Sequence, residues 1–155
     1  MQAVAPRRLY GLRGDVELVC WRFAQTVAFY RDCLGLPVVC QWAGVVRLDG
    51  GQGRWLTLWR ADPAYMSPED VRWGWHSPIS FVVGDLDAVC TALRAAGLDL
   101  ASHPQADSPA MTLNDPEGRA VTLLEPSATP CRARERAGIR TLMPEDDVSA
   151  LASAR

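Results

Sequence analysis

The feature that most constrains the fold of this chain is an order of elements that occurs twice. The first occurrence is a predicted strand over residues 16–21, a predicted helix over 24–34 and three short predicted strands over 37–42, 44–48 and 54–60. The strand segments alternate apolar and polar residues or form short apolar runs, whereas the helix carries an apolar stripe and is followed by a glycine. This segment therefore predicts a βαβββ module.

The second occurrence follows a connector that contains prolines and a glycine. It consists of a predicted strand over 78–83, an amphipathic helix over 85–96 and predicted strands over 98–101, 109–114 and 119–125. The repeated order of elements indicates an internal duplication. We therefore expect an α+β fold made of two βαβββ modules with mixed sheets.

The two modules divide the chain into five segments. The expected boundaries are an N-terminal arm over 1–14, module 1 over 15–62, a connector over 63–77, module 2 over 78–128 and a C-terminal extension over 129–155. In the extension, a proline followed by three acidic residues predicts a short helix over 144–153.

Composition and charge exclude several classes of partner. The chain has 155 residues, of which 48% are hydrophobic and 22% charged, as is typical of globular proteins. A net charge of -2 and a pI near 5.6 give no positive surface for nucleic acid or for an anionic membrane. No apolar run approaches the ~20 residues of a membrane-spanning helix, and residues 1–13 lack the apolar segment of a signal peptide. We therefore expect a cytoplasmic protein.

The cysteines do not form a recognisable motif. There are five, an odd number, and no two of them stand in a C-x-x-C pair. This spacing argues against a disulfide framework and against a zinc site. We expect Cys20, Cys33, Cys40 and Cys90 to be small apolar residues of the core.

The tryptophans are the most unusual part of the composition. The chain has six, and four of them lie between residues 55 and 75. They are Trp21, Trp42, Trp55, Trp59, Trp73 and Trp75. Rings this concentrated require either a core or a ligand to cover them.

Three segments, taken together, are similar to a known superfamily. They are Val-Ala-Phe-Tyr-Arg-Asp-Cys-Leu-Gly-Leu over 27–36, Phe-Val-Val-Gly-Asp-Leu-Asp-Ala over 81–88 and Asn-Asp-Pro-Glu-Gly over 114–118. In this order and spacing they resemble the vicinal-oxygen-chelate superfamily, which includes glyoxalases, bleomycin-resistance proteins and extradiol dioxygenases. The resemblance implies curved sheets around a concave cavity, usually within a homodimer, and leaves open whether one chain or two close that cavity.

The resemblance also implies where metal-dependent members hold their ion, on the first and last strands of each module. The matching positions are Asp15, Pro78, Thr122 and one residue within 55–59. Proline offers no donor group and neutral threonine is a poor ligand, whereas zinc, iron and manganese prefer imidazole or carboxylate groups. We therefore expect no metal and no cofactor, as in the metal-free, bleomycin-resistance-like branch.

Strand alternation assigns side chains to the expected cavity. In the strand over 54–60, Leu56 and Leu58 are expected to face the helix, which leaves Trp55, Thr57 and Trp59 on the cavity face. The same reasoning adds residues from other strands and from the connector. The complete set of expected ligand-binding residues is Glu17, Trp21, Trp42, Trp55, Thr57, Trp59, Trp73, Trp75, His76, Ser80 and Thr122.

These residues favour a metal-independent protein that sequesters a planar aromatic natural product or antibiotic by stacking it on tryptophans. One alternative is a metal-free lyase, isomerase or cyclase that uses Glu17 or His76 as an acid or base. Another is a metal-dependent glyoxalase or dioxygenase with displaced ligands, such as His76 with Asp15 or Glu17. Each of these residues can also have a purely structural role. Any one tryptophan can belong to a core or a dimer interface, and Glu17 can be solvated.

Overall fold

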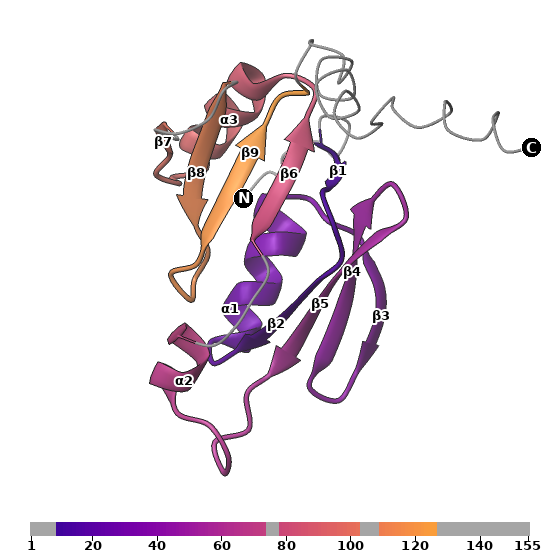
Figure 1. Cartoon of the computed structure of the whole chain (residues 1–155), viewed down its shortest axis with the longest axis vertical. Coiled ribbons are helices and arrows are strands. Elements are labelled where there is room, and N and C mark those ends of the chain that lie inside the picture. The colour runs from indigo at the N-terminus through magenta and orange to yellow at the C-terminus, as the bar shows by residue number, and fades with distance from the viewer. Residues whose placement is uncertain (1–8, 74–77, 103–108, 127–155) are drawn as a thin grey trace, which may run out of the picture.

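Module 1 has the expected element order. The structure, a computed structural model, describes residues 9–73, 78–102 and 109–126. Helix α1 runs directly into a π-helical turn, η2, so the two together span the helix that the sequence predicts (Figure 1). The elements are β2 (Val16–Cys20), α1 (Phe23–Ala28), η2 (Phe29–Cys33), β3 (Val38–Trp42), β4 (Val45–Gly51) and β5 (Arg54–Arg60).

Module 2 repeats this order, and a short helix precedes it in the connector. The strand predicted at 98–101 is shorter than expected and starts further along the chain, because β7 has only two residues, 101 and 102. The elements are α2 (Pro68–Trp73), β6 (Ile79–Val83), α3 (Leu86–Ala95), β7 (Ala101–Ser102), β8 (Ala110–Asn114) and β9 (Ala120–Leu124). The helix predicted at 144–153 lies outside the described residues.

The two modules share one sheet topology. Strand order is β2-β5-β4-β3 in the first sheet and β6-β9-β8-β7 in the second, so the first strand of each module lies beside its last. These two neighbours are parallel in both sheets, and the remaining pairs within each module are antiparallel. The mixed sheets and the α+β class are therefore confirmed, and the identical strand order supports an internal duplication.

A strand that the sequence did not predict, β1 (Leu9–Leu12), extends the second sheet. It pairs antiparallel with the free edge of β6, with Leu12 opposite Phe81. Figure 1 shows β1 running from β6 toward β4. Gly11 has a φ of +153°, and a Cβ there would lie 3.2 Å from the backbone of Gly51. Because four residues with a central glycine carry little strand signal, the free edge of β6 explains this element better than its own sequence.

The core is a single apolar cluster that draws on both modules. Helix α1 packs against β5 and α3 packs against β8, so the helices bury one face of each sheet. Burial alternates along β2 and β6, as the period of two in a strand requires. The largest fully buried side chains include Tyr30, Phe81, Leu18, Leu56 and Leu58. No helix within the described residues is long and apolar enough to cross a membrane.

One cysteine departs from the expectation that it belongs to the core. Cys20, Cys33 and Cys90 are buried, but Cys40 is half-exposed. Cys40 lies on β3, which forms an edge of the first sheet, and a register shift between Val38 and Cys40 interrupts the pairing with β4. An edge strand with a bulge cannot bury its side chains as a central strand does. Cys131 is outside the described residues.

Candidate functional site

The candidate site is built on the face of the first sheet that points away from the core. On β5, Leu56 and Leu58 are completely buried, so the alternating residues Trp55, Thr57 and Trp59 point to the opposite face. Trp55 is 37% exposed and Trp59 is 41% exposed, which is unusual for rings on a central strand. These two tryptophans therefore present apolar area that the rest of the described chain does not cover.

Neighbouring strands place further residues on this face. Trp59 lies opposite Val45 of β4, and Val45 lies opposite Trp42 of β3, so Trp42 shares the face and is 55% exposed. One row along the sheet, Thr57 lies between Glu17 of β2 and Arg47 of β4. Directly paired residues point to the same side of a sheet. We call this set the tryptophan face; its members are Glu17, Trp42, Arg47, Trp55, Thr57 and Trp59.

Sequence reasoning missed Arg47. Its Nε donates a hydrogen bond to Thr57 Oγ1 at 3.3 Å, and its guanidinium carbon lies 6.0 Å from the centre of the Trp42 ring. The signal was present, because Arg47 stands between the apolar residues Val46 and Leu48 and must point away from them. Which residues it would meet could not be read from that alternation, because the partners depend on strand register.

The other expected residues fall into separate groups. Ser80 and Thr122 pair in register on the second sheet, where both are half-buried on the face away from the core. Trp21 follows the end of β2 and is 39% exposed. Trp73 is the last residue of α2. Trp75 and His76 lie outside the described residues, so the structure does not test their predicted role.

The family follows from comparison with known proteins. Residues 15–124 match the model of the glyoxalase-like domain. The chain belongs to the glyoxalase-like domain family. This assignment confirms the resemblance to the vicinal-oxygen-chelate superfamily, because both βαβββ modules fall within the match. No curated protein sequence matches the chain.

Solved structures show the same glyoxalase-like fold at low sequence identity. TnmS3, an antibiotic binding protein from Streptomyces sp. CB03234, has a TM-score of 0.55 at 18% identity, covering 72% of this chain and 92% of TnmS3. A lactoylglutathione lyase from Agrobacterium tumefaciens has a TM-score of 0.55 at 20% identity, covering 81% and 92%. A glyoxalase/bleomycin resistance protein/dioxygenase from Nocardioides has a TM-score of 0.55 at 22% identity, covering 72% and 81%. These likenesses establish the fold and leave the ligand open.

The metal positions that the superfamily implies do not fit a metal in this glyoxalase-like domain. The carboxylate of Asp15 accepts a hydrogen bond from the backbone N–H of Trp55 at 2.9 Å, and Pro78 and Thr122 supply no strong ligand group. Across residues 9–73, 78–102 and 109–126, no three His, Cys, Asp or Glu side chains are grouped so that they could hold an ion. A displaced site that uses His76 lies outside these ranges.

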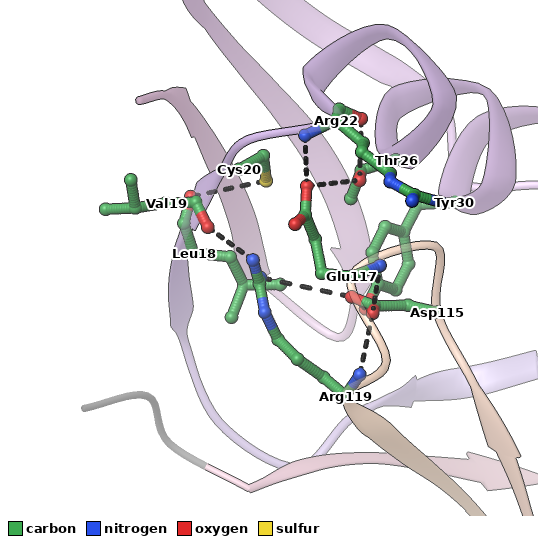
Figure 2. Close-up of polar contacts among 9 residues, drawn as sticks. All are labelled: Leu18, Val19, Cys20, Arg22, Thr26, Tyr30, Asp115, Glu117 and Arg119. Atoms are coloured by element: carbon green, nitrogen blue, oxygen red, sulfur yellow. Dashed lines mark hydrogen bonds and ion pairs between the residues drawn. The ribbon is translucent and has the colours of Figure 1, made fainter. Parts of the chain in front are cut away.

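A buried polar network joins the two modules of the glyoxalase-like domain (Figure 2). Asp115, in the β8–β9 hairpin, accepts a hydrogen bond from the Tyr30 hydroxyl at 3.1 Å and from the backbone N–H groups of Glu117 and Arg119 at 2.9 Å. Burial raises the pKa of Tyr30 well above its usual value, and the neighbouring Asp115 carboxylate raises it further. The Tyr30 hydroxyl therefore stays protonated and is the donor in its hydrogen bond with Asp115.

The same hairpin contacts the end of β2 and the start of α1. Figure 2 shows the guanidinium of Arg119 donating from Nη2 to the Val19 carbonyl, while Glu117 Oε1 accepts from the Arg22 N–H. Glu117 Oε1 also lies 3.4 Å from the hydroxyl of Thr26. Because Val19 pairs with Trp59, module 2 thereby fixes a strand that carries part of the tryptophan face.

Proposed function

We propose that this glyoxalase-like domain binds and sequesters a planar, partly aromatic small molecule, such as an antibiotic or another natural product, without a metal ion. The observation that carries the proposal is that Trp42, Trp55 and Trp59 share one sheet face and are each more than a third exposed. An offset-stacked aromatic pair contributes roughly 0.5–1.5 kcal/mol beyond the burial of its area. Several rings on one face would therefore hold a flat molecule by stacking and burial.

The likeness to TnmS3 shows that this fold can serve in antibiotic binding, whereas the equal likeness to a lactoylglutathione lyase shows that it can also serve in catalysis. TnmS3 is described as an antibiotic binding protein, and its sequence identity to this chain is 18%. The residues at the expected metal positions argue against a metal-dependent enzyme, because the metal-dependent reactions of the superfamily need ligands that Pro78 and Thr122 do not supply.

The test is a fluorescence titration of the metal-stripped full chain with a panel of planar natural products. Saturable quenching at one ligand per site, with the ligand recovered unchanged by mass spectrometry, is the expected result. The variant Trp55→Leu/Trp59→Leu should lose at least about tenfold in affinity, equal to 1.4 kcal/mol. Tyr65→Leu is the matched control, because Tyr65 is 87% exposed and lies outside the sheets. Equal affinity in both variants would place the ligand elsewhere.

A second candidate is a metal-free enzyme, and the position of Glu17 favours it. Glu17 is exposed on the tryptophan face opposite Thr57, and within the described chain it has neither a hydrogen bond nor an ion pair. Such a carboxylate can take a proton from a bound substrate. The mark of this function is a chemically altered ligand after incubation, with turnover lost in Glu17→Gln while binding is retained.

The oligomeric state belongs to the same proposal. The tryptophan face would cover a bound ring system from one side, and a second copy of the chain in a homodimer would supply an opposing wall. Light scattering on the eluting protein should then give twice the mass of one chain. A strictly monomeric protein that binds at full affinity would show that one chain suffices.

A further inference from the structure

We infer that the ligand carries a negatively charged group, such as a carboxylate, and that Arg47 binds it on the tryptophan face. The inference rests on the proposed function, because it concerns the same face. It adds a charge requirement to a site otherwise defined by stacking, and so narrows the ligand class to planar aromatic acids.

The position of Arg47 follows from burial and register. Its neighbours Val46 and Leu48 are almost fully buried, so the Arg47 side chain leaves β4 on the open side of the sheet. There it lies opposite Thr57 on one side and Cys40 on the other. Trp59 and Trp55 flank Thr57 along β5. The cation is therefore near the centre of the tryptophan face, with Trp42 and Trp59 in the next row of the sheet on one side and Trp55 in the next row on the other.

Two contacts hold the guanidinium in place. Its Nε donates to Thr57 Oγ1 at 3.3 Å, and Thr57 is only 2% exposed, so this acceptor sits on the rigid centre of the sheet. The Trp42 ring, 6.0 Å away, lies at the edge of the range in which a cation interacts with an aromatic face. A side chain ordered before binding loses less entropy when its ligand arrives.

The terminal nitrogens of Arg47 remain available to donate hydrogen bonds to a ligand. Within the described residues, neither terminal nitrogen of Arg47 has a hydrogen-bond acceptor, and no carboxylate lies within ion-pair distance. A guanidinium fork matches a carboxylate with two parallel hydrogen bonds, which are among the stronger ones in proteins.

Within the described residues, neither Glu17 nor Asp49, the acidic residues nearest to Arg47 on this side of the sheet, forms an ion pair with it. Glu17 lies two strands from Arg47, a separation of about 9–10 Å between backbones. Asp49 lies on the same side of β4, two residues along, but it is not within ion-pair distance of Arg47, and its Oδ1 accepts from the backbone N–H of Gly51 at 2.8 Å. A positive and a negative side chain therefore stand on opposite sides of Thr57. An anionic group is attracted toward Arg47 and repelled by Glu17, so these charges would also set the direction in which the ring system lies.

The experiment compares two probes of nearly the same size and shape, the anion anthracene-2-carboxylate and the neutral anthracene-2-carboxamide. Affinities of the full chain are measured by tryptophan quenching and calorimetry. The wild-type protein should bind the carboxylate about tenfold more tightly than the amide, and Arg47→Gln should bind both equally. Arg47→Lys should keep part of the preference, since it keeps the charge and loses the fork.

Arg60→Gln is the matched control. Arg60 lies on the same strand as the tryptophans, and its guanidinium also stacks on a ring, that of Phe23 at 5.1 Å, but it pairs with the buried Cys20 rather than with a residue of the tryptophan face. It should keep the wild-type preference. Equal affinity of the wild-type protein for both probes, or a preference that survives in Arg47→Gln, would overturn the role of Arg47 and leave the proposed function standing. No binding of either probe would overturn the proposed function and this inference with it.

Discussion

At the scale of single residues, burial decides which thiols can react. Cys20 is fully buried at the end of β2, and desolvation raises the pKa of its thiol to about 11, although the nearby Arg119 guanidinium opposes the rise. Cys40 is half-exposed on the edge strand β3. Because the thiolate is the nucleophile, Cys20 is inert near neutral pH, whereas Cys40 is accessible.

This contrast predicts the order of alkylation in the native protein. At pH 8, iodoacetamide should modify Cys40 at least about a hundredfold faster than Cys20, because Cys40 is half-exposed whereas Cys20 is buried and its raised pKa, about 11, leaves little thiolate. Peptide mass spectrometry over a time course measures both rates. In urea the two sites should react alike, which serves as the control; similar rates in native buffer would contradict the assigned burial of Cys20.

At the scale of elements, the two equivalent helices begin in different ways. Asp85 caps α3 from its own chain segment by accepting from the Ala88 N–H at 2.8 Å. Helix α1 has no side-chain cap at Arg22, and the carboxylate of Glu117 accepts the Arg22 N–H instead. The start of α1 therefore depends on a hairpin of the other module, an arrangement that local sequence patterns do not reveal.

Removal of this remote cap should loosen α1. We expect Glu117→Ala to lower the free energy of unfolding by about 0.5–2 kcal/mol, the usual range for a lost N-terminal cap. Urea denaturation gives that difference, and hydrogen exchange of the amides at residues 22–26 should quicken. Glu69→Ala is the control, because Glu69 is exposed on α2. An effect no larger than the control's would show that the hairpin contact does not stabilise the helix.

At the scale of the whole molecule, two connections join the modules in addition to their shared apolar core. One is the network of Tyr30, Asp115 and Arg119. The other is β1, which belongs to the second sheet by hydrogen bonding yet packs closely against the β4–β5 hairpin of the first. The tryptophan face is thus attached to a frame that both modules supply.

The close approach of β1 to the first sheet leaves little room for a side chain at Gly50. A Cβ at Gly50 would lie 2.9 Å from Leu12 Cβ and 3.0 Å from the Arg54 carbonyl oxygen, so Gly50→Ala should cost about 1–3 kcal/mol of folding free energy. Thermal and urea unfolding measure the loss. Gly14→Ala has open space around it and should leave stability nearly unchanged. Equal stability of the two variants would mean that β1 does not pack on this hairpin.

Much of this protein was determined by its sequence alone. The alternation of Leu56 and Leu58 with Trp55, Thr57 and Trp59 was enough to assign one set to the core and the other to the open face, because strand side chains alternate with a period of two. The two βαβββ modules followed from element order in the same way. These are local properties, since each depends on residues a few positions apart.

Only the tertiary structure decided which residues are neighbours on adjacent strands and which contact each other between the modules. Register placed Arg47 beside Thr57 and put Trp42 in the row of Trp59, and a free sheet edge turned residues 9–12 into β1. The contact between Glu117 and the start of α1 spans almost a hundred residues of sequence, so no local pattern could predict it. Pairing partners depend on the packing of the whole chain, and local sequence encodes only which side of a strand each residue occupies.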